Sequence, residues 1–66
     1  MEIELNGERR VVPDGITVAG LLSALSLAPG VVAVEVDLEI VPRTEYAARV
    51  LAAGSTVEIV TFVGGG

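Results

Sequence analysis

The sequence contains no cysteine and no histidine, and each absence excludes a kind of chemistry. Without cysteine there can be no disulfide and no thiolate metal site, and without histidine the chain lacks the side chain whose unperturbed pKa lies near neutrality. The carboxylates show no spacing typical of a metal site, so no metal is expected. Self-contained acid–base catalysis is therefore not expected.

Basic residues are also scarce, with four Lys and Arg against nine Asp and Glu and a formal net charge of -5. Because nucleic-acid phosphates attract a basic surface, nucleic-acid binding is not expected. The apolar runs are too short to span a membrane, and Glu2 follows Met1 directly where a signal peptide would be basic. These features predict a cytoplasmic protein with no membrane association.

What the sequence does contain is the alternation of apolar and polar residues that predicts strands. A domain of 66 residues buries only about 60% of the surface of its unfolded chain, so its core must be well patterned. The dipeptide Asn6-Gly7 tolerates the positive φ values of a tight hairpin turn. The expected strands cover residues 1–5, 9–12, 32–37 and 56–63, with a further short strand over residues 38–41 as an option.

A helix is expected over residues 17–27, where Thr17 is a suitable N-cap. Its apolar side chains recur at the spacing that places them on one helix face, which we expect to pack on the sheet. A glycine at position 20, inside the helix, destabilises it by about 1 kcal/mol relative to alanine. A close approach of the helix to a strand at this position would explain why glycine is tolerated. Pro29 and Gly30 provide the stop signal. The apolar face consists of Val18, Leu21, Leu22 and Leu25.

A shorter helical turn is expected later in the chain, capped by Thr44 and closed by Gly54. Tyr46 and Val50 are four residues apart and would face the same way. The resulting order of elements predicts an α+β fold, a mixed four- to five-stranded sheet with one main helix on one face. If the last strand enters beside the first and parallel to it, the arrangement is a β-grasp.

The sequence ends in three glycines, which we expect to form a flexible tail (residues 64–66) after a domain of residues 1–63. Three extended residues reach about 10 Å, enough to enter a narrow channel in an enzyme. Without side chains at Gly64, Gly65 and Gly66, an enzyme could approach the terminal carboxylate closely. The alternative is an ordinary disordered chain end.

Three features of the sequence are specific: its short length, the segment "EIVPRTEYAARVL" and the terminal pair Gly65-Gly66. In these features, and over most of its length, the chain resembles the ThiS-type sulfur carriers of thiamine biosynthesis, which are small ubiquitin-like β-grasp proteins. The stretch "IVPR", residues 40–43, is the most specific element of the resemblance, and Gly64 departs from the usual ending by adding a third glycine. The resemblance implies that Gly66 is adenylated and then converted to a thiocarboxylate that donates sulfur for thiazole formation.

The resemblance also implies the partners. These are an adenylating (E1-like) enzyme that uses ATP, a sulfur donor such as a cysteine desulfurase, and thiazole synthase. The chain itself is expected to bind no cofactor and not to be an enzyme. Two alternatives stay open: a sister sulfur carrier for molybdopterin synthesis or tRNA thiolation, and a ubiquitin-like modifier or binding module. Identification of the acceptor enzyme, or of isopeptide-linked adducts, would separate them.

Three residues are candidate partner contacts. Val60 and Phe62 share the strand face opposite Val57 and would lie outward just before the glycines, where exposed apolar residues suit docking. The alternative is that they cover the sheet, with Phe62 packed under the turn at Tyr46. Arg43 lies in the "IVPR" stretch and is expected either to be solvated or to contact a partner.

Overall fold

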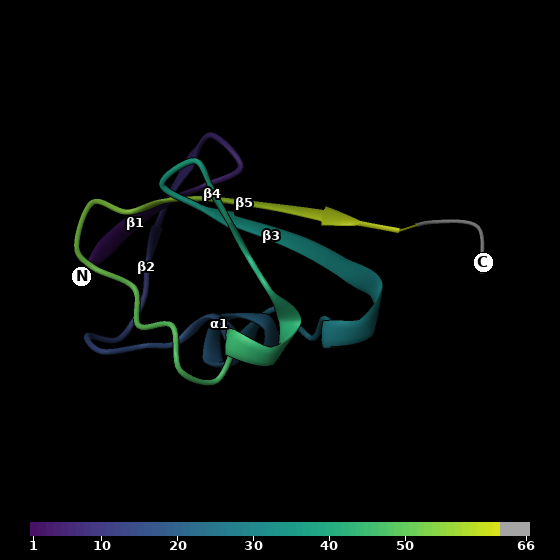
Figure 1. Ribbon diagram of the computed structural model, residues 1–66. Coiled ribbons are helices and arrows are strands. Elements are labelled where there is room, and N and C mark those ends of the chain that lie inside the picture. Colours follow the sequence, from purple (N-terminus) through teal and green to yellow (C-terminus); the bar gives the residue numbers. More distant parts are fainter. Residues whose placement is uncertain (63–66) are drawn as a thin grey trace.

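The computed structural model describes residues 1–62 and confirms the predicted α+β fold (Figure 1). One α-helix covers one face of a five-stranded mixed sheet. Val63 and the predicted glycine tail lie outside the described residues, as does the predicted boundary between them. The elements are β1 (Glu2–Leu5), β2 (Glu8–Val11), α1 (Val18–Ala24), the 3₁₀ turn η1 (Pro29–Val31), β3 (Val32–Val36), β4 (Glu39–Val41), the 3₁₀ turn η2 (Arg43–Glu45) and β5 (Thr56–Thr61).

Strand β5 lies at the centre of the sheet, whose order is β2-β1-β5-β3-β4. It runs parallel to β1 on one side and antiparallel to β3 on the other. The outer strands β2 and β4 each form an antiparallel hairpin with the neighbour next to them in the chain. The last strand therefore enters beside the first and parallel to it, as the sequence predicted, and it joins two hairpins that do not pair with each other (Figure 1).

The turn between β1 and β2 confirms the predicted hairpin. Asn6 and Gly7 both have positive φ, 49° and 83°, as a two-residue primed turn requires. Strand β2 begins at Glu8, one residue before the predicted range of 9–12, and all its residues are exposed. Val12 follows the strand and is buried, so it belongs to the core although it does not belong to the strand.

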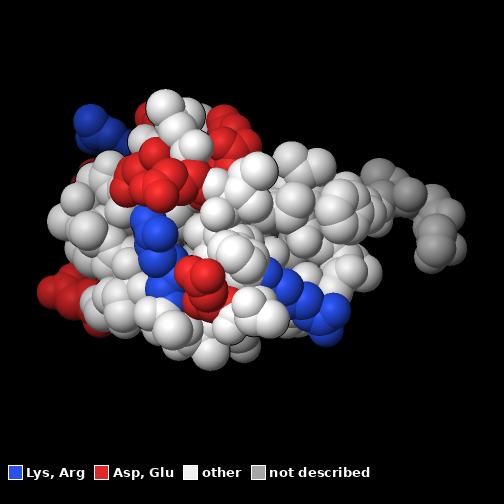
Figure 2. All heavy atoms as spheres, viewed as in Figure 1, with Lys and Arg blue, Asp and Glu red and all other residues white. Residues whose placement is uncertain are grey.

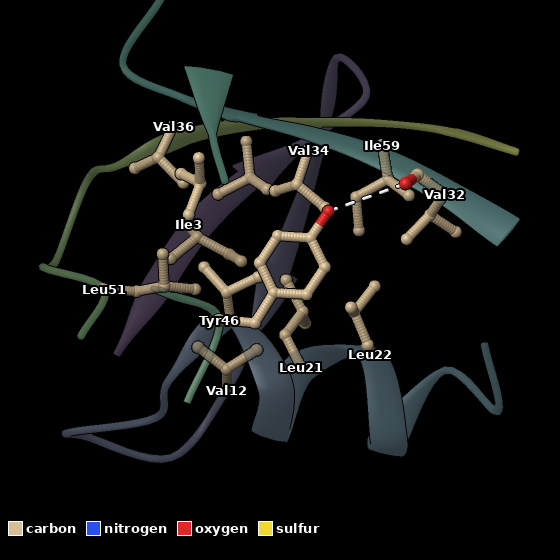
Figure 3. Close-up of a cluster of buried hydrophobic side chains, with 13 residues drawn as sticks. Ile3, Val12, Leu21, Leu22, Val32, Val34, Val36, Tyr46, Leu51 and Ile59 are labelled. Atoms are coloured by element: carbon tan, nitrogen blue, oxygen red, sulfur yellow. Dashed lines mark hydrogen bonds between the residues drawn. The ribbon is translucent and has the colours of Figure 1, made fainter. Parts of the chain in front are cut away.

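The core lies between helix α1 and the inner face of the sheet (Figure 3). Because side chains alternate along a strand, every second residue of β3 and β5 points into it. The hydroxyl of Tyr46 donates a long hydrogen bond of 3.5 Å to the carbonyl of Val32. The buried apolar residues are Ile3, Val12, Val18, Leu21, Leu22, Val32, Val34, Val36, Val41, Tyr46, Leu51, Val57 and Ile59.

Helix α1 ends at Ala24, three residues before the end of the predicted range of 17–27. Ser26 adopts the left-handed conformation with φ of 59°, and the amide of Leu27 donates to the carbonyl of Leu22 at 2.9 Å. These two features form the Schellman arrangement that terminates a helix, usually around a glycine. The Pro29-Gly30 pair is therefore not the stop signal; it lies within the separate turn η1.

At its other end, α1 is capped as predicted, because the hydroxyl oxygen of Thr17 accepts from the amide of Gly20 at 3.0 Å. The expected reason for a glycine at position 20 is wrong. A Cβ added there would lie 3.0 Å from Cγ1 of Ile16, in the segment that leads into the helix, and no strand atom is among its nearest neighbours. The glycine makes room for Ile16.

The predicted helical turn in the 40s is also corrected. Thr44 lies inside the single 3₁₀ turn η2, whose N-cap is Pro42 and which has no side-chain cap. Tyr46 is 5% exposed whereas Val50 is 55% exposed, so the two do not share a face. The helical spacing fails because the chain leaves the turn, and Val50 forms an isolated antiparallel bridge with Thr17.

Candidate functional site

Strand β5 presents two of the predicted contact residues on its outer face. Val60 is 61% exposed and Phe62 is 63% exposed, whereas Val57 and Ile59, on the opposite face of the strand, are buried. The amide of Phe62 donates to the carbonyl of Val31 at 2.8 Å, so the chain beyond β5 is still held by the sheet at this residue. The alternative that Phe62 packs under Tyr46 is wrong, because Phe62 is exposed.

These two side chains belong to an apolar patch at the end of the sheet. Ala33 lies directly opposite Val60 in the β3–β5 register and is exposed, and Val31, next to Phe62, is 46% exposed. We call Val31, Ala33, Val60 and Phe62 the C-terminal patch, since only four residues follow Phe62 in the sequence. Apolar residues exposed together in this way are typical of a protein-docking surface.

The third predicted contact residue lies close to the same end. A Cβ added to Gly30 would be 3.5 Å from Nη1 of Arg43, so the guanidinium lies over turn η1, immediately before Val31. The Arg43 side chain is exposed, and no carboxylate within residues 1–62 forms an ion pair with it. The structure thus brings a basic group to the turn that borders the C-terminal patch. Its role as a partner contact stays a prediction.

The outer face is acidic farther from the C-terminus. Glu35 and Glu58 are directly opposite each other in the β3–β5 register, which places two like charges side by side. Glu2 and Glu4 of β1 are also exposed, and Glu2 has a loose ion pair with Arg9 at 4.0 Å. In the view of Figure 2, red acidic atoms gather at the end of the molecule remote from the C-terminus, while the surface toward the C-terminal end is mostly uncharged.

One residue that the sequence did not single out touches the same strand. The side chain of Asn6 hydrogen-bonds both backbone groups of Ile59: its Oδ1 accepts from the amide at 2.8 Å, and its Nδ2 donates to the carbonyl at 3.2 Å. The sequence marked Asn6 only as a turn residue. A contact between residues 53 positions apart has no local signal in the sequence.

The remaining predicted site residues, Gly64, Gly65 and Gly66, lie outside the described residues. Within residues 1–62 there is no group of three or more acidic side chains placed to hold a metal ion. In the same part of the chain, no helix combines the length and apolar character needed to cross a membrane.

The fold places the protein in a known class. The architecture is a β-grasp, as in the ubiquitin-like carrier proteins: a mixed sheet packs against one helix, and its central strand is the last one before the glycines. The model of the ThiS family matches residues 2–66. The chain therefore belongs to the ThiS family.

Solved structures agree with this assignment. The crystal structure of the thiamine biosynthesis protein ThiS from Geobacter metallireducens is 35% identical, with a TM-score of 0.85 over the whole of both chains. A solution structure of a thiamine biosynthesis protein from the same organism is also 35% identical, with a TM-score of 0.84 over all of this chain and 88% of the other.

Two curated relatives are much longer proteins. Each is named thiazole synthase, one from Paramagnetospirillum magneticum with 44% identity and one from Magnetococcus marinus with 46% identity, both over 66 residues. The chain spans 20% of the length of each of these relatives.

Proposed function

We propose that this chain carries sulfur for thiazole formation as a thiocarboxylate on Gly66 and that it is a carrier and not a catalyst. The observation that carries the proposal is the family match, which extends over residues 2–66 and so includes the terminal glycines. The central position of β5 supports it, because the strand that precedes the glycines is paired within the sheet on both sides.

The proposed chemistry has two stages. The Gly66 carboxylate, which is ionised at neutral pH, attacks the α-phosphorus of ATP on the adenylating enzyme and displaces pyrophosphate to give an acyl-adenylate. Hydrosulfide attacks the carbonyl carbon, displaces AMP and gives the thiocarboxylate directly. A persulfide gives an acyl disulfide instead, and a thiol then attacks the donor's sulfur in that S–S bond, which releases the thiocarboxylate and leaves a disulfide between the thiol and the donor. The chain has no cysteine, so the sulfur comes from an external donor such as a cysteine desulfurase.

The structure supports a docking role for the C-terminal patch. Four residues follow Phe62, and at full extension they span at most about 14 Å. An enzyme that acts on Gly66 must therefore approach Val60 and Phe62, which are exposed, and the neighbouring Arg43. The proposed partners are the adenylating enzyme and thiazole synthase, the latter suggested by the names of the curated relatives. The acidic part of the outer face would favour a partner with basic groups.

Intact-mass measurement tests this function directly. After incubation with an adenylating enzyme, ATP and a sulfur source, we expect the mass to rise by the difference between one sulfur and one oxygen atom. A variant that lacks Gly66 should show no such rise, while Glu45→Gln, a change on the exposed turn η2, should behave as the wild type. A sulfur-dependent mass increase in the variant without Gly66 would contradict the proposal. The cytoplasmic location stays a prediction from the sequence.

A further inference from the structure

Strand β5 is paired on its two sides over different lengths. On the β3 side, pairing continues through Thr61, and the hydrogen bond from Phe62 to Val31 extends it further. On the β1 side, the ladder pairs only Glu4 with Thr56 and Leu5 with Val57 before the chain turns away toward β2. The part of β5 nearest the C-terminus therefore has a backbone neighbour on one side only.

The side chain of Asn6 extends the shorter side by one further step. Asn6 donates its backbone amide to the carbonyl of Val57 at 2.9 Å, which completes the ladder. Its carboxamide then bonds the amide and the carbonyl of Ile59, the two groups that another strand residue would have bonded. An asparagine can do this because it tolerates the left-handed conformation at φ 49° and carries both a donor and an acceptor.

Beyond Ile59, no hydrogen bond within residues 1–62 holds β5 on the β1 side. Within the described residues, the Asn6 carboxamide is thus the last such contact on that side, three positions before Phe62. Three extended residues cover about 10 Å, so a tilt of about 10° at Ile59 would displace the chain at Phe62 by about 2 Å.

We infer that Asn6 is a positioning residue: its carboxamide clamps Ile59 and so sets the direction in which β5 presents the chain's last residues to a partner enzyme. The inference rests on the proposed function and adds a specific residue to it. Reactions between groups held in a defined geometry are sensitive to small displacements, and about 1 Å of misplacement can reduce a rate by about 100-fold. Asn6 lies outside the C-terminal patch, so it acts on orientation and leaves the docking surface intact.

Two variants remove the clamp in steps. Asn6→Asp keeps an acceptor for the Ile59 amide but loses the donor to the Ile59 carbonyl, and Asn6→Gly loses both while keeping a residue suited to positive φ. Thr17→Ala is the matched control, because it removes a comparable capping bond from α1 on the other side of the molecule. All four proteins are compared in adenylation kinetics at a temperature at which each is fully folded.

We expect Asn6→Gly to lower kcat about tenfold with KM within about twofold of the wild type, because docking is kept and orientation is lost. The kcat for Asn6→Asp should lie between those for Asn6→Gly and the wild type, and the kcat for Thr17→Ala should equal that for the wild type. Hydrogen exchange, which needs no enzyme, should be faster at the Ile59 amide in Asn6→Gly and unchanged there in Thr17→Ala.

The outcomes separate the two proposals. A wild-type kcat in folded Asn6→Gly, or an equal loss in Thr17→Ala, would overturn the positioning role while the carrier function stands. An unchanged exchange rate at Ile59 would overturn the clamp itself. Absence of adenylation in the wild type would contradict the proposed function and the positioning role that depends on it.

Discussion

The two faces of the sheet use the same strands for different purposes. Ile59 on the inner face of β5 is 8% exposed and packs under α1, whereas its neighbour Val60 on the outer face is 61% exposed and is not covered by any described element. Both are β-branched residues that favour strands, so propensity does not separate their roles. The face that a side chain occupies, and not its type, thus decides whether it stabilises the fold or remains available to a partner.

The most severe way to test this difference is to truncate the two neighbours in turn. Ile59→Ala should lower the free energy of unfolding by about 3 kcal/mol, since it removes apolar contacts and leaves a cavity, whereas Val60→Ala should change it by less than about 0.5 kcal/mol. Urea denaturation of both variants measures this, with similar m values required for the comparison. Equal losses would contradict the assignment of the faces.

A charge on the outer face should affect partner recognition and leave the fold intact. Phe62→Asp and Val60→Asp should each reduce kcat/KM for adenylation by about tenfold or more, because a charge would be buried against the enzyme. Val11→Asp is the control, as Val11 is 77% exposed on the same outer face but at the far edge, opposite Glu2. Normal turnover in a folded Phe62→Asp variant would show that the C-terminal patch is not the docking surface.

Relief of the like-charge pair on the outer face should produce a smaller effect. Glu58→Gln should raise the free energy of unfolding by about 0.5 kcal/mol, because it removes the repulsion from Glu35 directly opposite. Added salt should reduce the gain. Glu39→Gln is the control, because it makes the same change in charge at a position opposite the uncharged Val36, and it should raise the free energy of unfolding by less. An equal rise in both variants would show that the net charge, and not the Glu35–Glu58 repulsion, is responsible.

The smallest effect is expected from the buried hydroxyl of Tyr46. Tyr46→Phe should change the free energy of unfolding by no more than about 0.5 kcal/mol, because the hydrogen bond to Val32 is long at 3.5 Å. Thermal unfolding followed by circular dichroism can measure it, with Tyr46→Leu as a control that also removes ring packing. A loss above about 1 kcal/mol for Tyr46→Phe would show that the hydroxyl contributes more than its geometry indicates.

Much of the fold could be predicted from local patterns. The alternation along residues 32–36 and 56–61 correctly predicted which strand faces are buried. The dipeptide Asn6-Gly7 predicted the hairpin turn, and Thr17 predicted where the helix begins. The end of the helix could not be predicted, because Ser26 adopts a conformation that usually marks glycine. Periodicity also failed at Tyr46, where a single 3₁₀ turn does not continue into a helix.

The candidate site was predicted in part. The outward direction of Val60 and Phe62 follows from a period of two, which a sequence shows directly. The clamp of Asn6 on Ile59 does not, since it depends on the parallel pairing of β1 with β5 across 53 positions of sequence. The approach of Arg43 to the turn at Gly30 likewise depends on how two separate segments meet in the fold.

The parallel pairing of β1 with β5 has a mechanical consequence. Force applied between the start of β1 and the end of β5 would act along the strands, so the hydrogen bonds that join them would be loaded together in shear instead of opening one after another. Because β5 also connects the two hairpins, its extraction would divide the sheet into two pieces. An unfoldase that pulls on the chain beyond β5 would therefore load the central strand of the sheet at its first step.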